Sequence, residues 1–98
     1  MHKYGNQAVG ILETESVTAC FLAIDAATKA ANVVVEGIGR NRFASEMCVT
    51  FRGSVSDVRE AMEAAKRAAE PVSRIVAKEV ISGPTEYVED SIRAGLPG

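Results

Sequence analysis

The stretch Met47-Cys48-Val49-Thr50-Phe51-Arg52-Gly53-Ser54 decides the fold of this 98-residue chain. Every second residue from Met47 to Phe51 is apolar, a period of two that is typical of a strand with one buried face. Gly53 ends the strand, and Ser54-Val-Ser-Asp57 has the spacing of a helix-capping box. The sequence therefore predicts a strand that leads directly into a helix.

The residues after Ser54 continue this pattern to the end of the chain. The predicted helix has an apolar stripe and ends at Pro71. The members of the stripe are Val55, Val58, Met62, Ala65 and Ala69. Residues 74–81 predict another strand, which Ser82-Gly83-Pro84 interrupts. A short amphipathic helix is expected around Tyr87, Val88 and Ile92.

The residues before Met47 predict a first strand over 8–12, a helix and a second strand. Thr14 or Ser16 is expected to cap the helix, which Asn32 closes. Its expected buried face is formed by Val17, Cys20, Phe21, Ile24, Thr28 and Ala31. Residues 33–35 are β-branched and predict the second strand. Residues 37–42 are expected to form a tight turn in which two glycines and an asparagine supply positive φ angles.

The predicted order is β-α-β-β-α-β with a short C-terminal helix. This order indicates an α+β, ferredoxin-like fold with a four-stranded antiparallel sheet and both main helices on one face. We expect a flexible N-terminal arm at residues 1–7, one domain at 8–92 and a C-terminal tail at 93–98.

Composition and charge argue against several classes of function. The net charge is -2 and the pI about 5.4, which argues against nucleic acid as a partner. No stretch has the length of a signal peptide core or a membrane span, so we expect a cytoplasmic protein without a membrane partner. Cys20 and Cys48 lie in apolar segments with no CxxC motif, which indicates reduced, buried thiols.

No catalytic, metal or cofactor site can be assembled from the sequence. His2 is the only histidine and lies near the N-terminus. The carboxylates fall on helix starts and faces expected to be exposed. They are Glu13, Glu15, Glu60, Glu63, Glu86, Glu89 and Asp90. Gly37-x-Gly39 lacks the third glycine of a dinucleotide loop, and the strand from Met47 lacks the stacking aromatics of an RNA-recognition sheet. The protein is therefore not expected to be an enzyme.

Arg40 and Arg42 flank the predicted turn beside Phe43. In a monomer they would form an ordinary basic loop. Around a symmetry axis they would form a positive ring that attracts anions and repels cations. The residues alone leave both interpretations open.

Four stretches, in this order, resemble the hexamer-forming, single-domain (BMC) shell proteins of bacterial microcompartments. They are Ala-Val-Gly-Ile-Leu-Glu-Thr at 8–14, Ala-Ile-Asp-Ala-Ala-Thr-Lys-Ala-Ala-Asn-Val at 23–33, Arg-Gly-Ser-Val at 52–55 and Ala-Lys-Glu-Val-Ile at 77–81. The resemblance implies cyclic hexamers that pack edge to edge into a shell and form a central pore for small metabolites. It also implies other shell proteins as partners, the shell itself as the location, and no cofactor.

The resemblance also implies which residues act. The pore loop would be Gly39, Arg40, Asn41, Arg42, Phe43, Ala44 and Ser45. Lys29 corresponds to the lysine that packs across the boundary between neighbouring hexamers. The family commonly has an arginine and a histidine around a proline as a second edge contact, whereas this chain has Gly83-Pro84-Thr85. The pore loop is slightly longer than the family's usual glycine-serine turn, and its side chains are bulkier.

A function of another class fits the same order of elements. Ferredoxin-like domains also serve as regulatory modules that bind a small effector at an oligomer interface. Such a module predicts a dimer or trimer, whereas a shell protein predicts a ring of six. Apart from the resemblance, the sequence fits both.

Overall fold

A computed structural model describes residues 7–40 and 46–95. Its elements are β1 (Ala8–Thr14), α1 (Val17–Ala30), β2 (Val34–Arg40), β3 (Met47–Gly53), α2 (Val55–Ala69), β4 (Ile75–Ile81) and α3 (Glu86–Gly95). The four strands form one antiparallel sheet in the order β2-β3-β1-β4. The predicted ferredoxin-like α+β fold with a C-terminal helix is confirmed.

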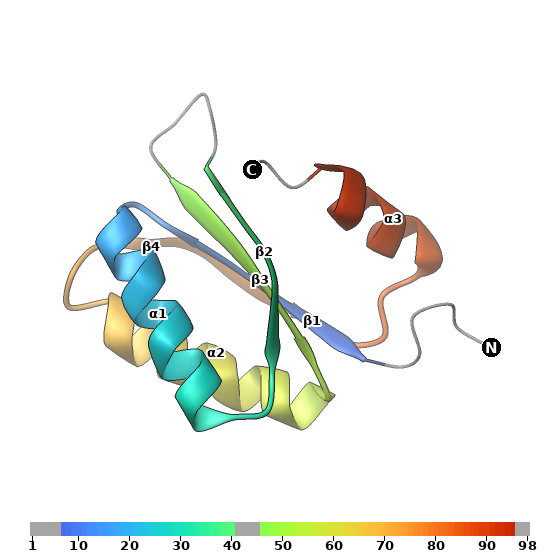
Figure 1. The fold of residues 1–98 in the computed structure, drawn as a ribbon, viewed down its shortest axis with the longest axis horizontal. Coiled ribbons are helices and arrows are strands. Elements are labelled where there is room, and N and C mark those ends of the chain that lie inside the picture. The colour runs from blue at the N-terminus through green and yellow to red at the C-terminus, as the bar shows by residue number, and fades with distance from the viewer. Residues whose placement is uncertain (1–6, 41–45, 96–98) are drawn as a thin grey trace.

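The sheet separates two layers of unequal size. Figure 1 shows α1 and α2 side by side, and α3 apart from both of them. Phe51 belongs to the buried cluster that α1 and α2 cover. Its neighbour Arg52 therefore points to the opposite face, because successive side chains of a strand alternate. We call this second face the outer face of the sheet; α3 packs there.

Serine side chains start both main helices. Ser16 Oγ accepts a hydrogen bond from the Ala19 backbone N–H at 3.1 Å, so Ser16 is the cap and not Thr14. Ser54 Oγ accepts from the Asp57 N–H at 3.1 Å, as the capping-box spacing predicts. Each cap satisfies a backbone donor that the first turn leaves free.

The buried face of α1 is composed of small residues, which differs from the sequence expectation. Its buried residues are Ala19, Cys20, Ala23 and Ala27, whereas Phe21 is 55% exposed. The facing side of α2 is also rich in alanine, with Ala61, Ala64, Ala65 and Ala69 buried. Alanines allow the two helix backbones to approach closely, so the larger side chains at Phe21 and Leu22 point outward.

Gly10 fixes the position of α2 on the sheet. A Cβ atom at Gly10 would lie 2.9 Å from Val58 Cγ1 and 3.0 Å from Met62 Sδ. These distances are too short for ordinary packing, so α2 rests directly on the backbone of the central strand β1.

The second strand is longer than the sequence predicted. β2 extends through Gly37 and Gly39 to Arg40, so the expected turn over 37–42 is wrong for these residues. Neither glycine has a positive φ. The pairing with β3 skips a residue between Val35 and Gly37, which places Glu36 in a β-bulge. Glycines in a strand commonly mark such irregular pairing.

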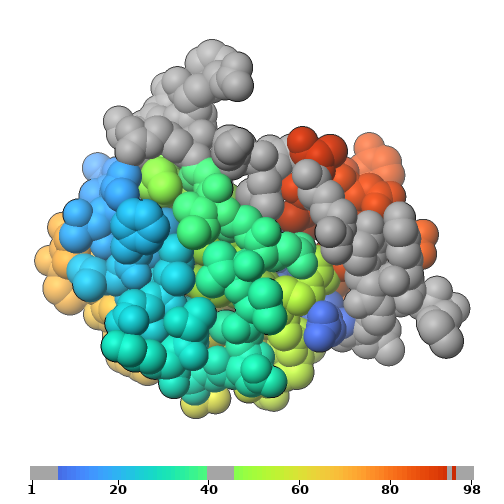
Figure 2. Space-filling view, in the orientation of Figure 1, coloured from blue at the N-terminus to red at the C-terminus, as the bar shows by residue number. Residues whose placement is uncertain are grey.

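A glycine turn precedes the last helix. Gly83 has φ 64°, a conformation that favours glycine. The helix α3 then runs from Glu86 to Gly95. In Figure 2, α3 and α1 lie toward opposite sides of the visible face, with β2 between them.

Candidate functional site

The predicted pore loop connects β2 to β3. Its first two residues, Gly39 and Arg40, end β2 and pair with Cys48 and Met47. The other five, Asn41, Arg42, Phe43, Ala44 and Ser45, lie outside the described residues. The described strands show that this segment joins two antiparallel neighbours, β2 and β3.

Lys29 lies in the last turn of α1 on the molecular surface. Its Nζ donates to Asp25 Oδ2 at 2.8 Å, one helical turn earlier. The two side chains are 75% and 60% exposed, so the ion pair is well solvated and weak. Lys29 is thus exposed at a helix end, where a cation also interacts favourably with the helix dipole.

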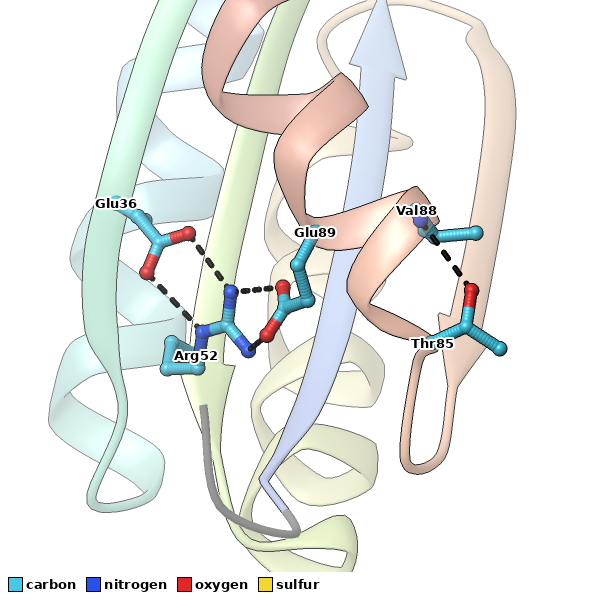
Figure 3. Close-up of polar contacts among 5 residues, drawn as sticks. All are labelled: Glu36, Arg52, Thr85, Val88 and Glu89. Atoms are coloured by element: carbon cyan, nitrogen blue, oxygen red, sulfur yellow. Dashed lines mark hydrogen bonds and ion pairs between the residues drawn. The ribbon is translucent and has the colours of Figure 1, made fainter. Parts of the chain in front are cut away.

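At the predicted second edge contact, the chain forms the connection to α3. Thr85 Oγ1 accepts a hydrogen bond from the Val88 backbone N–H at 3.3 Å (Figure 3). Its backbone carbonyl accepts from the Glu89 N–H at 2.9 Å. Thr85 therefore caps α3, and Gly83 supplies the turn before it.

A buried ionic cluster, which the sequence did not indicate, lies on the outer face of the sheet. Figure 3 shows the Arg52 guanidinium between Glu36 of β2 and Glu89 of α3. Arg52 Nε and Nη2 donate to the two carboxylate oxygens of Glu36 at 3.0 and 2.9 Å. Arg52 Nη1 and Nη2 donate to the two oxygens of Glu89. Both carboxylates are therefore bound in bidentate fashion, the strongest form of this pair.

The cluster is largely withdrawn from water. The side chains of Arg52 and Glu89 are 8% and 0% exposed, and that of Glu36 is 23% exposed. Hydrogen bonds to Glu89 and then to Glu36 raise the pKa of Arg52 further above its already high ordinary value, against the opposing effect of burial. The expectation that Glu89 lies on an exposed face is therefore wrong.

The sequence carries no local signal for this contact. Arg52 and Glu89 are 37 residues apart, and each fits an ordinary exposed position of its own element. Only the packing of α3 on the outer face brings them together. The position of Arg52 in its strand was a weak indication of this contact. Its side chain alternates with that of Phe51 and so points away from the core, toward the face of the sheet that α1 and α2 leave uncovered.

The two cysteines differ in exposure. Cys20 is buried, as expected, whereas Cys48 is only partly buried on the outer face. Burial raises the pKa of both thiols, and the negative charge of Glu13 adds to the effect at Cys48. Both thiols are free and protonated at neutral pH.

The described part of the chain has neither a metal-binding cluster nor a helix that could span a membrane. Within residues 7–40 and 46–95, no group of three or more His, Cys, Asp or Glu side chains is arranged to hold a metal ion. Among the helices described there, none has the length and apolar character that crossing a membrane requires. His2 lies outside these residues.

The two edges of the described sheet present different surfaces. On the β2 edge, Val34 and Ile38 are 64% and 39% exposed. Beside β4, an open groove runs between the strand and α2. Its lining residues are Arg59, Met62, Glu63, Lys78, Glu79 and Val80. The β2 edge thus exposes apolar side chains, and the β4 side has a groove of mixed charge.

Comparison with known proteins identifies the family. Residues 8–96 match the family model of the BMC domain. The chain belongs to the BMC domain family. This BMC-domain protein is 35% identical over 91 residues to the bacterial microcompartment shell protein PduA of Citrobacter freundii, covering 92% of this chain and 96% of the relative. It is 31% identical over 93 residues to the shell protein EutM of Escherichia coli K12, covering 94% of each.

Two further comparisons involve longer chains. The shell protein PduT of Citrobacter freundii is 40% identical over 81 residues, which are 82% of this BMC-domain protein and 44% of PduT. The crystal structure of a microcompartments protein from Desulfitobacterium hafniense matches with a TM-score of 0.78 at 22% identity. The match covers 96% of this chain and about half, 51%, of that one. At this identity the likeness supports the fold alone.

Proposed function

We propose that this BMC-domain protein is a structural shell protein of a bacterial microcompartment, located in the cytoplasm, and that it forms cyclic hexamers. The observation that carries the proposal is the match of residues 8–96 to the BMC domain, with near full-length similarity to PduA and EutM, which are named as shell proteins. Its partners would be copies of itself and other shell proteins. No catalytic step is assigned to it.

The two sheet edges support a ring. A cyclic assembly of more than two subunits needs a heterologous interface, in which one surface of each subunit contacts a different surface of the next. The exposed apolar residues Val34 and Ile38 lie on the β2 edge, and the groove lined by Met62 and Val80 lies on the β4 edge. These surfaces are at opposite ends of the sheet, as a head-to-tail ring requires.

Residues 39–45 would line the central opening of the ring. In this arrangement Arg40 and Arg42 of each subunit would point toward a common axis. A ring of cations favours small anionic or polar metabolites over cations, and the side chains of Asn41 and Phe43 would narrow the opening. Gly39, Ala44 and Ser45 would form the rest of the loop.

Lys29 would lie at the outer edge of the hexamer and contact the neighbouring ring. The exposed position of Lys29 suits this role. The usual second edge contact is replaced by Gly83-Pro84-Thr85, where Thr85 serves as a helix cap. Edge-to-edge packing of the rings is accordingly expected to be weaker than ring formation.

The mass of the intact assembly tests the ring. Native mass spectrometry of the purified protein is expected to give six times the mass of the 10.4 kDa chain. Ile38→Glu places a charge on the apolar β2 edge and is expected to shift the population to smaller species. Glu60→Gln on the exposed side of α2 is the control and should retain the ring. A dimer or trimer of the unmodified protein would contradict the proposal.

Replacing both loop arginines tests the pore. Arg40→Ser with Arg42→Ser is expected to reduce the passage of small anions through the assembled ring, because the positive potential at the opening is lost. Ion selectivity of rings in planar bilayers measures this change directly. Thermal unfolding should change little, since Arg40 is the last residue of β2 and its backbone pairing with Met47 does not need its side chain. Unaltered anion preference would count against a pore lined by these arginines.

A further inference from the structure

Arg52 connects two parts of the molecule through one side chain. The same guanidinium binds Glu36, in the bulge of β2, and Glu89, on α3. We propose that Arg52 couples the docking of α3 to the conformation of the bulged half of β2, so that loosening one loosens the other. An effect of this coupling on a pore rests on the proposed function, in which residues 39–45 at the end of β2 line the opening. The coupling itself does not depend on the proposed function.

The helix α3 is short, and its fully buried polar side chain is Glu89. The helix has 10 residues, and isolated helices shorter than about 12–15 residues are marginal in water. Glu89 is fully buried, whereas Tyr87 is 82% exposed. Val88 and Ile92 are half-buried. A helix this short is expected to lose its structure when it leaves the sheet, and the fully buried Glu89 is the side chain that joins it to Arg52.

The bulge of β2 also depends on Arg52. β2 is an edge strand, so only β3 pairs with it among the described strands. The pairing with β3 skips Glu36, so the regular pattern of backbone hydrogen bonds between the strands is interrupted at the bulge. The two hydrogen bonds from Arg52, which lies on β3, hold Glu36 in place. Residues 37–40 continue from this point toward the predicted pore loop.

The coupling follows from the shared burial of the cluster. With α3 docked, the Arg52 side chain is 8% exposed, so its bond to Glu36 acts in a poorly solvated environment and is strong. When α3 leaves, water reaches Arg52 and the same pair becomes an exposed ion pair of small value. Linkage requires the effect to be reciprocal, so weakening Glu36 must also weaken the docking of α3.

Hydrogen exchange of the full chain tests the coupling. In Glu89→Gln, exchange of the α3 amides is expected to accelerate by about two orders of magnitude, because a short undocked helix gives little protection. Exchange of residues 37–40 is expected to accelerate by about five- to 150-fold, the usual range of coupling between sites. The amides of α2 should not change. The Glu36 carboxylate is partly exposed. In Glu36→Gln, exchange of the α3 amides is also expected to accelerate, because the coupling acts in both directions.

Glu60→Gln is the matched control, since it removes one negative charge from an exposed position of α2 that lies outside the groove beside β4. It should leave exchange in α3 and in residues 37–40 unchanged. Two results would overturn the coupling. One is that Glu89→Gln accelerates exchange in α3 but not in residues 37–40. The other is that Glu36→Gln leaves exchange in α3 unchanged. Native mass of the same samples reports ring formation separately, so failure of the coupling and failure of the ring are distinguishable.

Discussion

Replacing Arg52 with methionine is expected to lower the free energy of unfolding by about 3–5 kcal/mol, the usual cost of removing one partner from a buried ion pair. Methionine fills a similar volume but donates no hydrogen bond, so the fully buried Glu89 loses both of its bonds to Arg52. Glu36 loses its bidentate partner as well. Urea unfolding at a fixed protein concentration measures the change.

Two further variants separate two contributions to this loss of stability: the cost of burying a carboxylate without Arg52, and the loss of packing around the Arg52 side chain. Arg52→Met combined with Glu36→Gln and Glu89→Gln removes all three charges, and it should recover a large part of the loss, because neutral amides are cheaper to bury than a carboxylate. Arg52→Lys keeps the charge but not the planar fork, and it should fall between the two. If Arg52→Met alone unfolds at the same urea concentration as the unmodified protein, the cluster contributes nothing to stability.

Most of the fold could be predicted because its signals are local. The alternation from Met47 to Phe51, the serine at position 54 and the stripe that contains Val58 and Met62 each require only neighbouring residues to interpret. The order of these elements, β-α-β-β-α-β, then indicated the ferredoxin-like arrangement of the strands. The elements predicted least well are those whose form depends on distant contacts.

Two errors show what local patterns miss. Phe21 was placed in the core because apolar residues recur at helical spacing, yet α1 buries the row of small residues that contains Ala19, Ala23 and Ala27, and Phe21 is 55% exposed. Gly37 and Gly39 were read as a turn, yet the neighbouring strand β3 extends the ladder past them and a bulge at Glu36 absorbs the irregularity. In both cases a partner element decided the outcome.

The candidate site was predicted unevenly for the same reason. Lys29 could be predicted as an edge contact because it lies near a helix end in the stretch 23–33, which resembles the family. Its exposed position agrees with a contact between neighbouring hexamers, which remains a prediction. The pairing of Arg52 with Glu89 could not be nominated, because α3 crosses the outer face only in the folded chain. An isolated arginine and an isolated glutamate do not reveal that they share a site.

Replacing Phe51 with alanine is expected to lower the free energy of unfolding by about 3–5 kcal/mol, because the change removes a large buried side chain and leaves a cavity. Phe51 is 0% exposed and lies on β3 between Val35 of β2 and Gly10 of β1. Gly10 has no side chain and cannot fill the space. Phe51→Leu, which keeps most of the volume, should cost less than about 1.5 kcal/mol.

The same variant connects stability with assembly. Subunits that bind each other only when folded stabilise the fold by mass action, so the unfolding midpoint of a ring-forming protein rises with protein concentration. The midpoint of Phe51→Ala should therefore shift upward between dilute and concentrated samples, as that of the unmodified protein does. Ile38→Glu, on the β2 edge, should abolish this dependence. A midpoint that does not depend on concentration in any of the three proteins would indicate that folding and ring formation are not linked.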